Sequence, residues 1–195
     1  VVRDIRSSEA NLYAELRRIC SMCQDYDPKS EQAREFYRQM QAKIFYAVTS
    51  RTPSEIMIGR ADASQPDMGL RTWSHTEIRK ADAAIAKNYL GDSELVELNR
   101  LTSILLDVFE DQLDIGRLTT MQQARDGLDS NLRHLGRSVL AHGGQVSSAQ
   151  AKRAAEREYV RFDERRRMLR KEQADAELAA LKATSKSLPK RPKGS

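Results

Sequence analysis

The chain has 195 residues, of which 39% are hydrophobic and 31% are charged, and its net charge at pH 7 is +5. This length fits one domain, or one domain with an appendage, and the high charged fraction is typical of long, half-exposed helices. Nine Gly and five Pro are too few for a turn-rich all-β sandwich. No apolar run approaches the ~18 residues that a membrane-spanning helix needs, so we expect no membrane segment.

Hydrophobic periodicity and capping residues divide the chain into seven helices. In chain order, we expect them over residues 4–23, 28–49, 53–63, 75–90, 93–115, 120–141 and 148–184. The last helix would be roughly 55 Å long at 1.5 Å per residue, so it must project from the globule or pair with another chain. No segment alternates apolar and polar residues as a strand does. The predicted fold class is therefore all-α, a bundle of about seven helices with a long projecting C-terminal helix.

Capping signals set the expected helix boundaries. Asp27 before Pro28 predicts the start of the second helix. Two capping boxes predict the next two starts, Thr52-x-x-Glu55 and Ser74-x-x-Glu77. The expected helix ends are a left-handed cap at Gly91 and the pair Gly143-Gly144.

Two cysteines, Cys20 and Cys23, form a CxxC pair. A structural zinc site needs four ligands, and no second CxxC or His pair follows at a suitable spacing. We therefore expect two reduced thiols in a reducing compartment, the cytoplasm.

Four carboxylates lie at spacings that place them on one helix face: Asp107, Glu110, Asp111 and Asp114. They could hold Mg²⁺, but a solvated face is favoured because no second helix offers Glu-x-x-His ligands. The chain also lacks G-x-G-x-x-G and P-loop motifs. We expect neither a metal nor a cofactor.

The longest irregular stretch, residues 60–73, contains the sole Trp. Its distinctive residues are Arg60, Asp62, Asp67, Arg71 and Trp73. Loops on a rigid scaffold often carry function, and Trp73 is the candidate ligand-binding residue. The structural alternative is that Arg60–Asp62 and Lys80–Asp82 form salt bridges while Trp73 fills the core.

All of the excess positive charge lies in the last quarter of the chain. Residues 149–195 hold 14 Lys and Arg against 7 Asp and Glu, a net charge of +7. Arginines at i, i+4 spacing on the last helix could follow nucleic-acid phosphates. The candidate nucleic-acid-binding residues are Arg157, Arg161, Arg165, Arg166, Arg170 and Lys171. The alternatives are a solvated helix and a weak two-stranded coiled coil, whose heptads fail at Arg166 and Gln173.

Separated phrases recur in a characteristic order along the chain. They are VRDIRSSE (2–9), DYDPKS (25–30), RAD (60–62), PDMGL (66–70), TW (72–73), AKNYL (86–90), ELNR (97–100) and the segment 154–162. Over residues ~2–162 the chain thereby resembles the bacterial virulence-associated RhuM family. The resemblance implies a protein of mobile elements or pathogenicity islands, whose members usually carry a helix-turn-helix-like N-terminal segment. Because the chain begins at Val1 rather than Met, we expect it to be the C-terminal helical domain of such a protein.

The resemblance transfers no secure catalytic residue, but it marks a set of polar positions as the first place to seek a site. Besides Trp73, this polar set consists of Arg60, Asp62, Lys80, Asp82, Lys87, Asn88 and Asn99. We expect a RhuM-like domain over residues 1–162, a charged helical extension over 163–184 and a disordered basic tail over 185–195.

These observations favour a non-enzymatic regulatory or interaction domain of a DNA-associated protein. It would form a homo-oligomer or bind a partner protein, with non-specific contacts to DNA or RNA phosphates. One alternative is an enzyme or toxin, directed at nucleic acid, that uses the polar set. The other is a structural subunit of a host-interaction or phage-defence assembly that docks through residues 163–184.

Overall fold

The computed structural model describes residues 17, 20–21, 23–116, 120–141 and 143–187. The helices in this part of the chain are α2 (Glu31–Thr49), α3 (Pro53–Arg60), the 3-10 helix η1 (Pro66–Gly69), α4 (Lys80–Ala83), the 3-10 helix η2 (Ala86–Tyr89), α5 (Asp92–Asp114), α6 (Met121–His134) and α7 (Ser148–Ser187). The described residues form no strand, so the predicted all-α class is confirmed. Their six α-helices come close to the seven expected. The helix predicted over 4–23 falls mostly outside the described residues.

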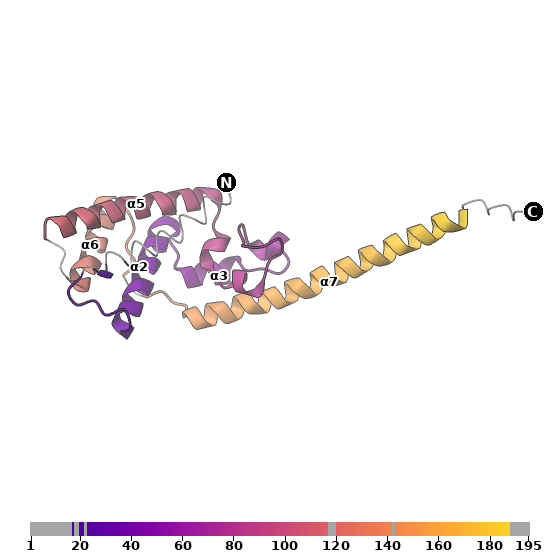
Figure 1. The fold of residues 1–195 in the computed structure, drawn as a ribbon, viewed down its shortest axis with the longest axis horizontal. Helices are drawn as coiled ribbons and strands as arrows, with labels where there is room; N and C mark the ends of the chain where they lie inside the picture. Colours follow the sequence, from indigo (N-terminus) through magenta and orange to yellow (C-terminus); the bar gives the residue numbers. More distant parts are fainter. Residues whose placement is uncertain (1–16, 18–19, 22, 117–119, 142, 188–195) are drawn as a thin grey trace, which may run out of the picture.

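Helix α2 lies at the centre of the bundle. It packs on α3, α5 and α6, and Figure 1 shows α5 running along the bundle beside α2 and α6. The buried residues of α2 are Ala33, Phe36, Met40, Ile44, Phe45 and Ala47. Those of α5 are Leu95, Leu98, Leu101, Thr102, Leu105 and Phe109. Each large side chain buried in this way contributes roughly 1.5–3 kcal/mol, so the contact of α2 with α5 forms the main core.

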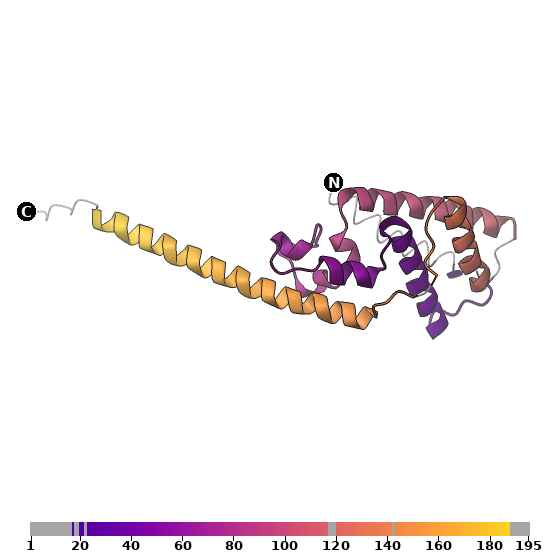
Figure 2. The ribbon, with the colours of Figure 1, turned by 180° about the vertical axis from the view of Figure 1, so that it is seen from behind.

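Helix α7 belongs to the bundle only through its first half. It packs on α3, α4 and η1, where Ala151 and Ala155 are fully buried and Tyr159 and Phe162 are half-buried. Every residue over 167–184 is exposed. At 1.5 Å per residue its 40 residues span about 60 Å, and Figures 1 and 2 show the outer part extending away from the bundle. The predicted long projecting helix is confirmed.

Within the described ranges, every helix is too short or too polar to traverse a lipid bilayer.

The capping box that starts α3 is confirmed. The Thr52 hydroxyl accepts from the Glu55 N–H at 3.4 Å, and the Glu55 carboxylate accepts from the Thr52 N–H at 2.8 Å. The same carboxylate accepts from the N–H of Gln145 at 3.3 Å. Burial alone would raise the pKa of Glu55, but the hydrogen bonds from Thr52 and Gln145 hold it below its ordinary value. This cap therefore ties the start of α3 to the segment that precedes α7.

The predicted start of α2 is wrong by three residues. Its N-cap is Ser30, whose hydroxyl accepts from the Ala33 N–H at 3.1 Å. The Asp27 carboxylate accepts from the N–H of Lys29 at 2.9 Å instead. Asp27 thus stabilises the turn that precedes the helix.

The second predicted capping box is also wrong. Residues 74–77 form bends, and α4 begins only at Lys80, with the Asp82 carboxylate accepting from the Arg79 N–H at 2.8 Å. The side chain of Glu77 bonds to Arg166 at 3.3 Å and to Arg170 at 2.5 Å on α7. A tertiary contact has therefore taken the carboxylate that the local box required.

Two predicted helix ends differ from the structure. Gly91 adopts an extended conformation, with φ of −72°, and is the N-cap of α5 rather than the end of the preceding helix. Helix α6 ends at His134, before Gly136 with φ of +69°, so it stops short of Gly143-Gly144. A left-handed glycine immediately after a helix is a strong termination signal, because a Cβ opposes that conformation.

The loop after α3 contains three successive residues with positive φ: Asp67 at 52°, Met68 at 49° and Gly69 at 82°. Met68 is fully buried, so its packing compensates for an unfavourable backbone conformation. Gly69 lies so close to α3 that a Cβ there would be 2.2 Å from the Arg60 carbonyl oxygen. This position requires glycine for two separate reasons.

We expect Gly69→Ala to lower the free energy of unfolding by more than about 2 kcal/mol, since it adds both backbone strain and a clash. Gly116→Ala is the matched control, because Gly116 has φ of +70° but nothing within 4 Å of an added Cβ. Gly116→Ala should lower the free energy of unfolding by about 1 kcal/mol. Urea denaturation followed by circular dichroism measures both, and equal losses would contradict the proposed role of the close contact.

Candidate functional site

Arg60, the last residue of α3, forms the strongest interaction of the polar set. Its guanidinium donates two hydrogen bonds of 2.6 Å to the Glu94 carboxylate and one of 2.9 Å to the Tyr89 carbonyl. The hydrogen bond from Arg60 holds the pKa of Glu94 below its ordinary value, although burial opposes this. The same hydrogen bond raises the pKa of Arg60. This fork joins the end of α3 to the first turn of α5.

The two salt bridges expected within the polar set are wrong. The Asp62 carboxylate accepts from the hydroxyl and N–H of Ser64 at 2.6 and 2.8 Å, and these bonds lower its pKa. Lys80 pairs with Glu156 of α7 at 3.0 Å. Both residues therefore stabilise local turns or helix contacts near α7.

The remaining polar residues hold the segment around α4 and η2 together. The Asn88 amide donates to the Asp82 carbonyl at 2.9 Å, and the Asn88 carbonyl accepts from the Arg71 N–H at 2.7 Å. Asp82, Lys87 and Asn88 are all buried. Asn99 lies on α5, where its carbonyl accepts from the Ser103 hydroxyl at 3.2 Å. The side chains of Asp82 and Asn88 therefore have a structural role, whereas the contact of Asn99 is made by its backbone.

The polar set does not converge on one cavity. Of its seven members only Arg60 lines either of the two cavities described, a depression of about 530 Å³ beside η1. Trp73 lies outside that lining and is half-buried against the core, as the structural alternative expected. A catalytic role for the set and a ligand role for Trp73 stay predictions.

Most of the arginines proposed for nucleic-acid binding make contacts within the protein. Arg161 pairs with Glu158 at 2.8 Å, and Arg166 with Asp163 at 2.5 Å. Arg165 donates to the Ala63 carbonyl at 2.6 Å, and Arg170 pairs with Glu77. These cations would have to exchange their partners to bind phosphates.

Two members of that group differ from the others. Arg157 and Lys171 are exposed, and neither forms an ion pair in the part of the chain that the structure describes. Of the six predicted residues, these two are the best placed to contact an external anion.

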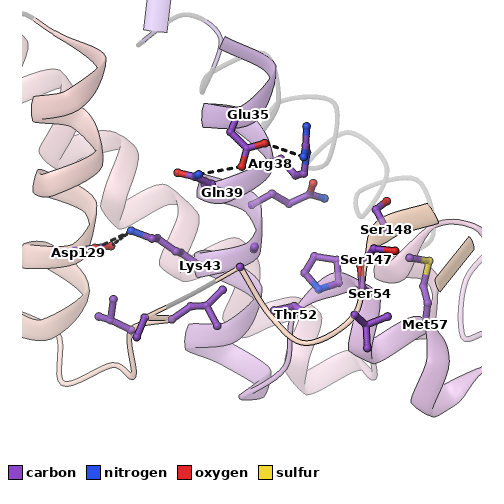
Figure 3. A pocket seen from close by; sticks show the side chains of 18 of the residues that line it. Glu35, Arg38, Gln39, Lys43, Thr52, Ser54, Met57, Asp129, Ser147 and Ser148 are labelled. Carbon is purple, nitrogen blue, oxygen red and sulfur yellow. Dashed lines mark hydrogen bonds and ion pairs between the residues drawn. The ribbon is translucent and has the colours of Figure 1, made fainter. Parts of the chain in front are cut away.

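A larger cavity, of about 890 Å³, was not predicted from the sequence. It is an open groove between α2, α6, the segments over 137–141 and 143–147 and the starts of α3 and α7, shown in Figure 3. At one end Lys43 donates to both oxygens of Asp129, at 2.6 and 2.7 Å. At the other end lie Ser54, Ser147 and Ser148. No spacing motif could have revealed this groove, because its walls come from four separate parts of the chain.

Cys20 and Cys23 are buried and form no disulfide among the described residues. Burial raises the pKa of Cys20 to about 12 and that of Cys23 to about 11. The thiolate forms that would attack a substrate or bind a metal are therefore scarce at neutral pH. Among the described residues no three His, Cys, Asp or Glu side chains gather into a cluster that could hold a metal ion.

Comparison with known proteins identifies a family but no characterised relative. The model of the virulence protein RhuM family matches residues 1–170. No curated protein and no solved structure matches the chain.

We expect Arg60→Gln to lower the free energy of unfolding by about 2 kcal/mol at pH 7, because it removes charged hydrogen bonds to a half-buried carboxylate. Arg161→Gln, which breaks the largely exposed pair with Glu158, should cost less than ~0.5 kcal/mol. The pKa of Glu94 is lowered in the folded protein. Its ion pair with Arg60 therefore stabilises the fold fully above the ordinary Glu pKa of ~4.3, and this stabilisation is lost as the pH falls through the pKa of Glu94 in the folded protein.

The difference in the free energy of unfolding between the wild type and Arg60→Gln should therefore become smaller below about pH 4. Denaturant titrations at pH 3 and pH 7 measure it. A difference that stays constant over this range would contradict the assigned electrostatic origin.

Proposed function

The chain belongs to the virulence protein RhuM family, and we propose that it acts there as a non-enzymatic regulatory or interaction domain that pairs with a second copy of itself through the outer half of α7. The observation that carries this proposal is the exposure of every residue over 171–184. Leu178 and Leu181 are 53% and 67% exposed. An isolated helical segment of this length is marginally stable in water, so a partner that covers its apolar face would stabilise it.

The outer half of α7 carries a short seam suited to helix pairing. Lys171, Ala174, Leu178 and Leu181 follow one another at spacings of three and four residues. This is the a/d pattern of a two-stranded coiled coil. In this register Arg166 and Gln173, where the pattern seemed to fail, occupy a solvent-facing position. We call these four residues the α7 seam.

Charges beside the α7 seam favour a second copy in parallel orientation. Glu177 and Lys182 are five residues apart and occupy the g and e positions that flank the seam. In a parallel pair each g residue faces the e residue of the next heptad on the other helix, so Glu177 of each copy would face Lys182 of the other. Neither side chain forms an ion pair in the described part of the chain.

The seam is short, and Lys171 occupies one of its a positions. A polar a residue specifies register at a cost in stability. The pairing should therefore be weak and concentration-dependent, which suits a reversible regulatory contact.

Phosphate contacts are a secondary part of the proposal. The resemblance associates this domain with DNA-linked proteins, and Arg157 and Lys171 are exposed cations without ion pairs among the described residues. The enzyme alternative is not carried forward, because the polar set is distributed over caps and helix contacts rather than around one cavity.

We expect Leu178→Glu to abolish self-association without changing the thermal stability of the monomer, because it places a charge in the α7 seam. Leu169→Glu is the matched control, since Leu169 is also 53% exposed but lies outside the seam. Light scattering coupled to size exclusion, at protein concentrations up to about 1 mM, measures the mass.

A charge exchange tests the parallel register. Glu177→Lys should weaken the pairing by placing two lysines opposite each other, and adding Lys182→Glu should restore it. A wild-type chain that is monomeric at every concentration would overturn the proposal. Equal losses for Leu178→Glu and Leu169→Glu would also overturn it.

We expect a short DNA duplex to bind weakly, with a logarithmic salt slope near −2 if only Arg157 and Lys171 contact phosphates. A slope near −5 would mean that all six candidate cations engage, after exchanging their internal partners. Fluorescence anisotropy between ~50 and ~200 mM salt measures the slope. Arg157→Gln combined with Lys171→Gln should flatten it, whereas an unchanged slope would contradict the assignment.

A further inference from the structure

The α7 seam continues toward the bundle as a stripe of exposed, mostly basic residues. Spacings of four and three residues alternate back along the chain from Lys171, so the stripe lies on the same helix face as the seam. Every member of the stripe is exposed. We call it the basic stripe, and its residues are Arg153, Arg157, Val160, Glu164, Arg167 and Lys171.

The basic stripe lies on the side of α7 opposite the bundle. Ala151, Ala155 and Phe162 belong to the core or pack against it. At 3.6 residues per turn, these three lie roughly half a turn away from Arg153 and Val160. In Figures 1 and 2 the bundle lies above the first half of α7, and the opposite side of this helix faces solvent. The stripe is therefore open to a second molecule along its whole length.

The charge of the basic stripe is strongly positive. It carries four cations and one carboxylate, that of Glu164. Arg153, Arg157 and Lys171 form no ion pair within the described ranges. Arg167 pairs with a carboxylate of its own helix at 2.8 Å, but its side chain is 77% exposed, so other N–H groups of its guanidinium stay accessible. The field of the stripe therefore attracts anions.

The length of the basic stripe determines which anion fits it. At 1.5 Å per residue, Arg153 and Lys171 lie about 27 Å apart along the helix axis, too far for one small anion. A nucleic-acid duplex carries one negative charge per ~1.7 Å of its axis and offers phosphates along the whole stripe. Three of the four cations are Arg, whose planar guanidinium matches the geometry of phosphate oxygens. This pattern favours a nucleic-acid duplex.

Pairing of two chains would bring two such stripes together. In the parallel pair proposed above, on which this inference rests, Lys171 of each copy faces Lys171 of the other, and Arg167 faces Arg167. Like charges in this arrangement oppose pairing. A polyanion between the two stripes neutralises them and so favours the paired state.

We infer that the paired basic stripes bind one nucleic-acid duplex between them, so that duplex binding and pairing strengthen each other. By linkage, the factor by which the duplex tightens the pairing equals the factor by which pairing tightens duplex binding. Basic helix segments that diverge from a short coiled coil straddle a duplex in the same way. The salt slope near −2 expected above describes a single chain that uses two cations. A pair that engages four cations from each copy would give a slope of about −7.

The test is sedimentation velocity of the full chain with a fluorescent DNA duplex of ~20 base pairs at ~50 mM salt. We expect two chains per duplex at protein concentrations at least about tenfold below those at which the chain pairs alone. Leu178→Glu should weaken duplex binding by about tenfold, because it breaks the α7 seam. Leu169→Glu adds the same charge outside the seam and should weaken duplex binding by less than about twofold.

A second pair of variants tests the basic stripe itself. Arg153 and Lys152 are adjacent and both exposed, but Lys152 lies about 100° away around the helix. Arg153→Gln should reduce the salt slope of the paired complex by about two, one for each chain, whereas Lys152→Gln should leave it unchanged. Fluorescence anisotropy between ~50 and ~200 mM salt measures both slopes.

The outcomes separate this inference from the proposed pairing. If the chain pairs alone but the duplex binds only single chains, the inference fails and the pairing stands. The same holds if Arg153→Gln and Lys152→Gln change the slope equally. Displacement of the duplex by poly-glutamate at equal charge concentration would also overturn the inference, because the stripe would then recognise acidic protein. A chain that stays monomeric both alone and on the duplex would overturn the pairing itself.

Discussion

The packing of α7 on α3 is the constraint on which the rest of the structure depends. Two fully buried alanines, Ala151 and Ala155, lie on the half of α7 that packs on α3, α4 and η1. Both backbone groups of Ala63 are also held from α7, since Glu158 accepts from its N–H at 3.0 Å and Arg165 donates to its carbonyl. Small side chains permit a close approach of the helix backbones, and the polar contacts fix the axial position. This packing directs the outer half of α7 into solvent and places its start beside the groove.

The same packing determines what the charge of the chain can do. A net charge of +7 over residues 149–195 suggests a nucleic-acid surface, but a cation bound to a neighbouring carboxylate must lose that contact before it can bind a phosphate. The Arg166 and Arg170 pairs with Glu77 attach α7 to the segment before α4. Part of the basic character of α7 therefore stabilises the fold.

The α7 seam and the groove lie at opposite ends of one helix. The seam occupies the outer part of α7, while the groove lies beside its first turn. A seam variant can therefore leave the groove intact, and a groove variant can leave the seam intact, since residues this far apart and without shared partners act independently.

Local rules determined much of this protein from sequence. The all-α class, the Thr52–Glu55 capping box and the length of α7 all follow from interactions between residues at most four apart along a helix. Tertiary structure decided what such spacing cannot encode. It drew Glu77 from its expected cap to the arginines of α7, and it paired Lys43 with Asp129, 86 residues away, in the wall of the groove. The physical reason is that a side chain binds the partner that folding brings within reach. In a groove built from separate segments, the packing of those segments determines that partner, and the spacing of residues along the chain does not.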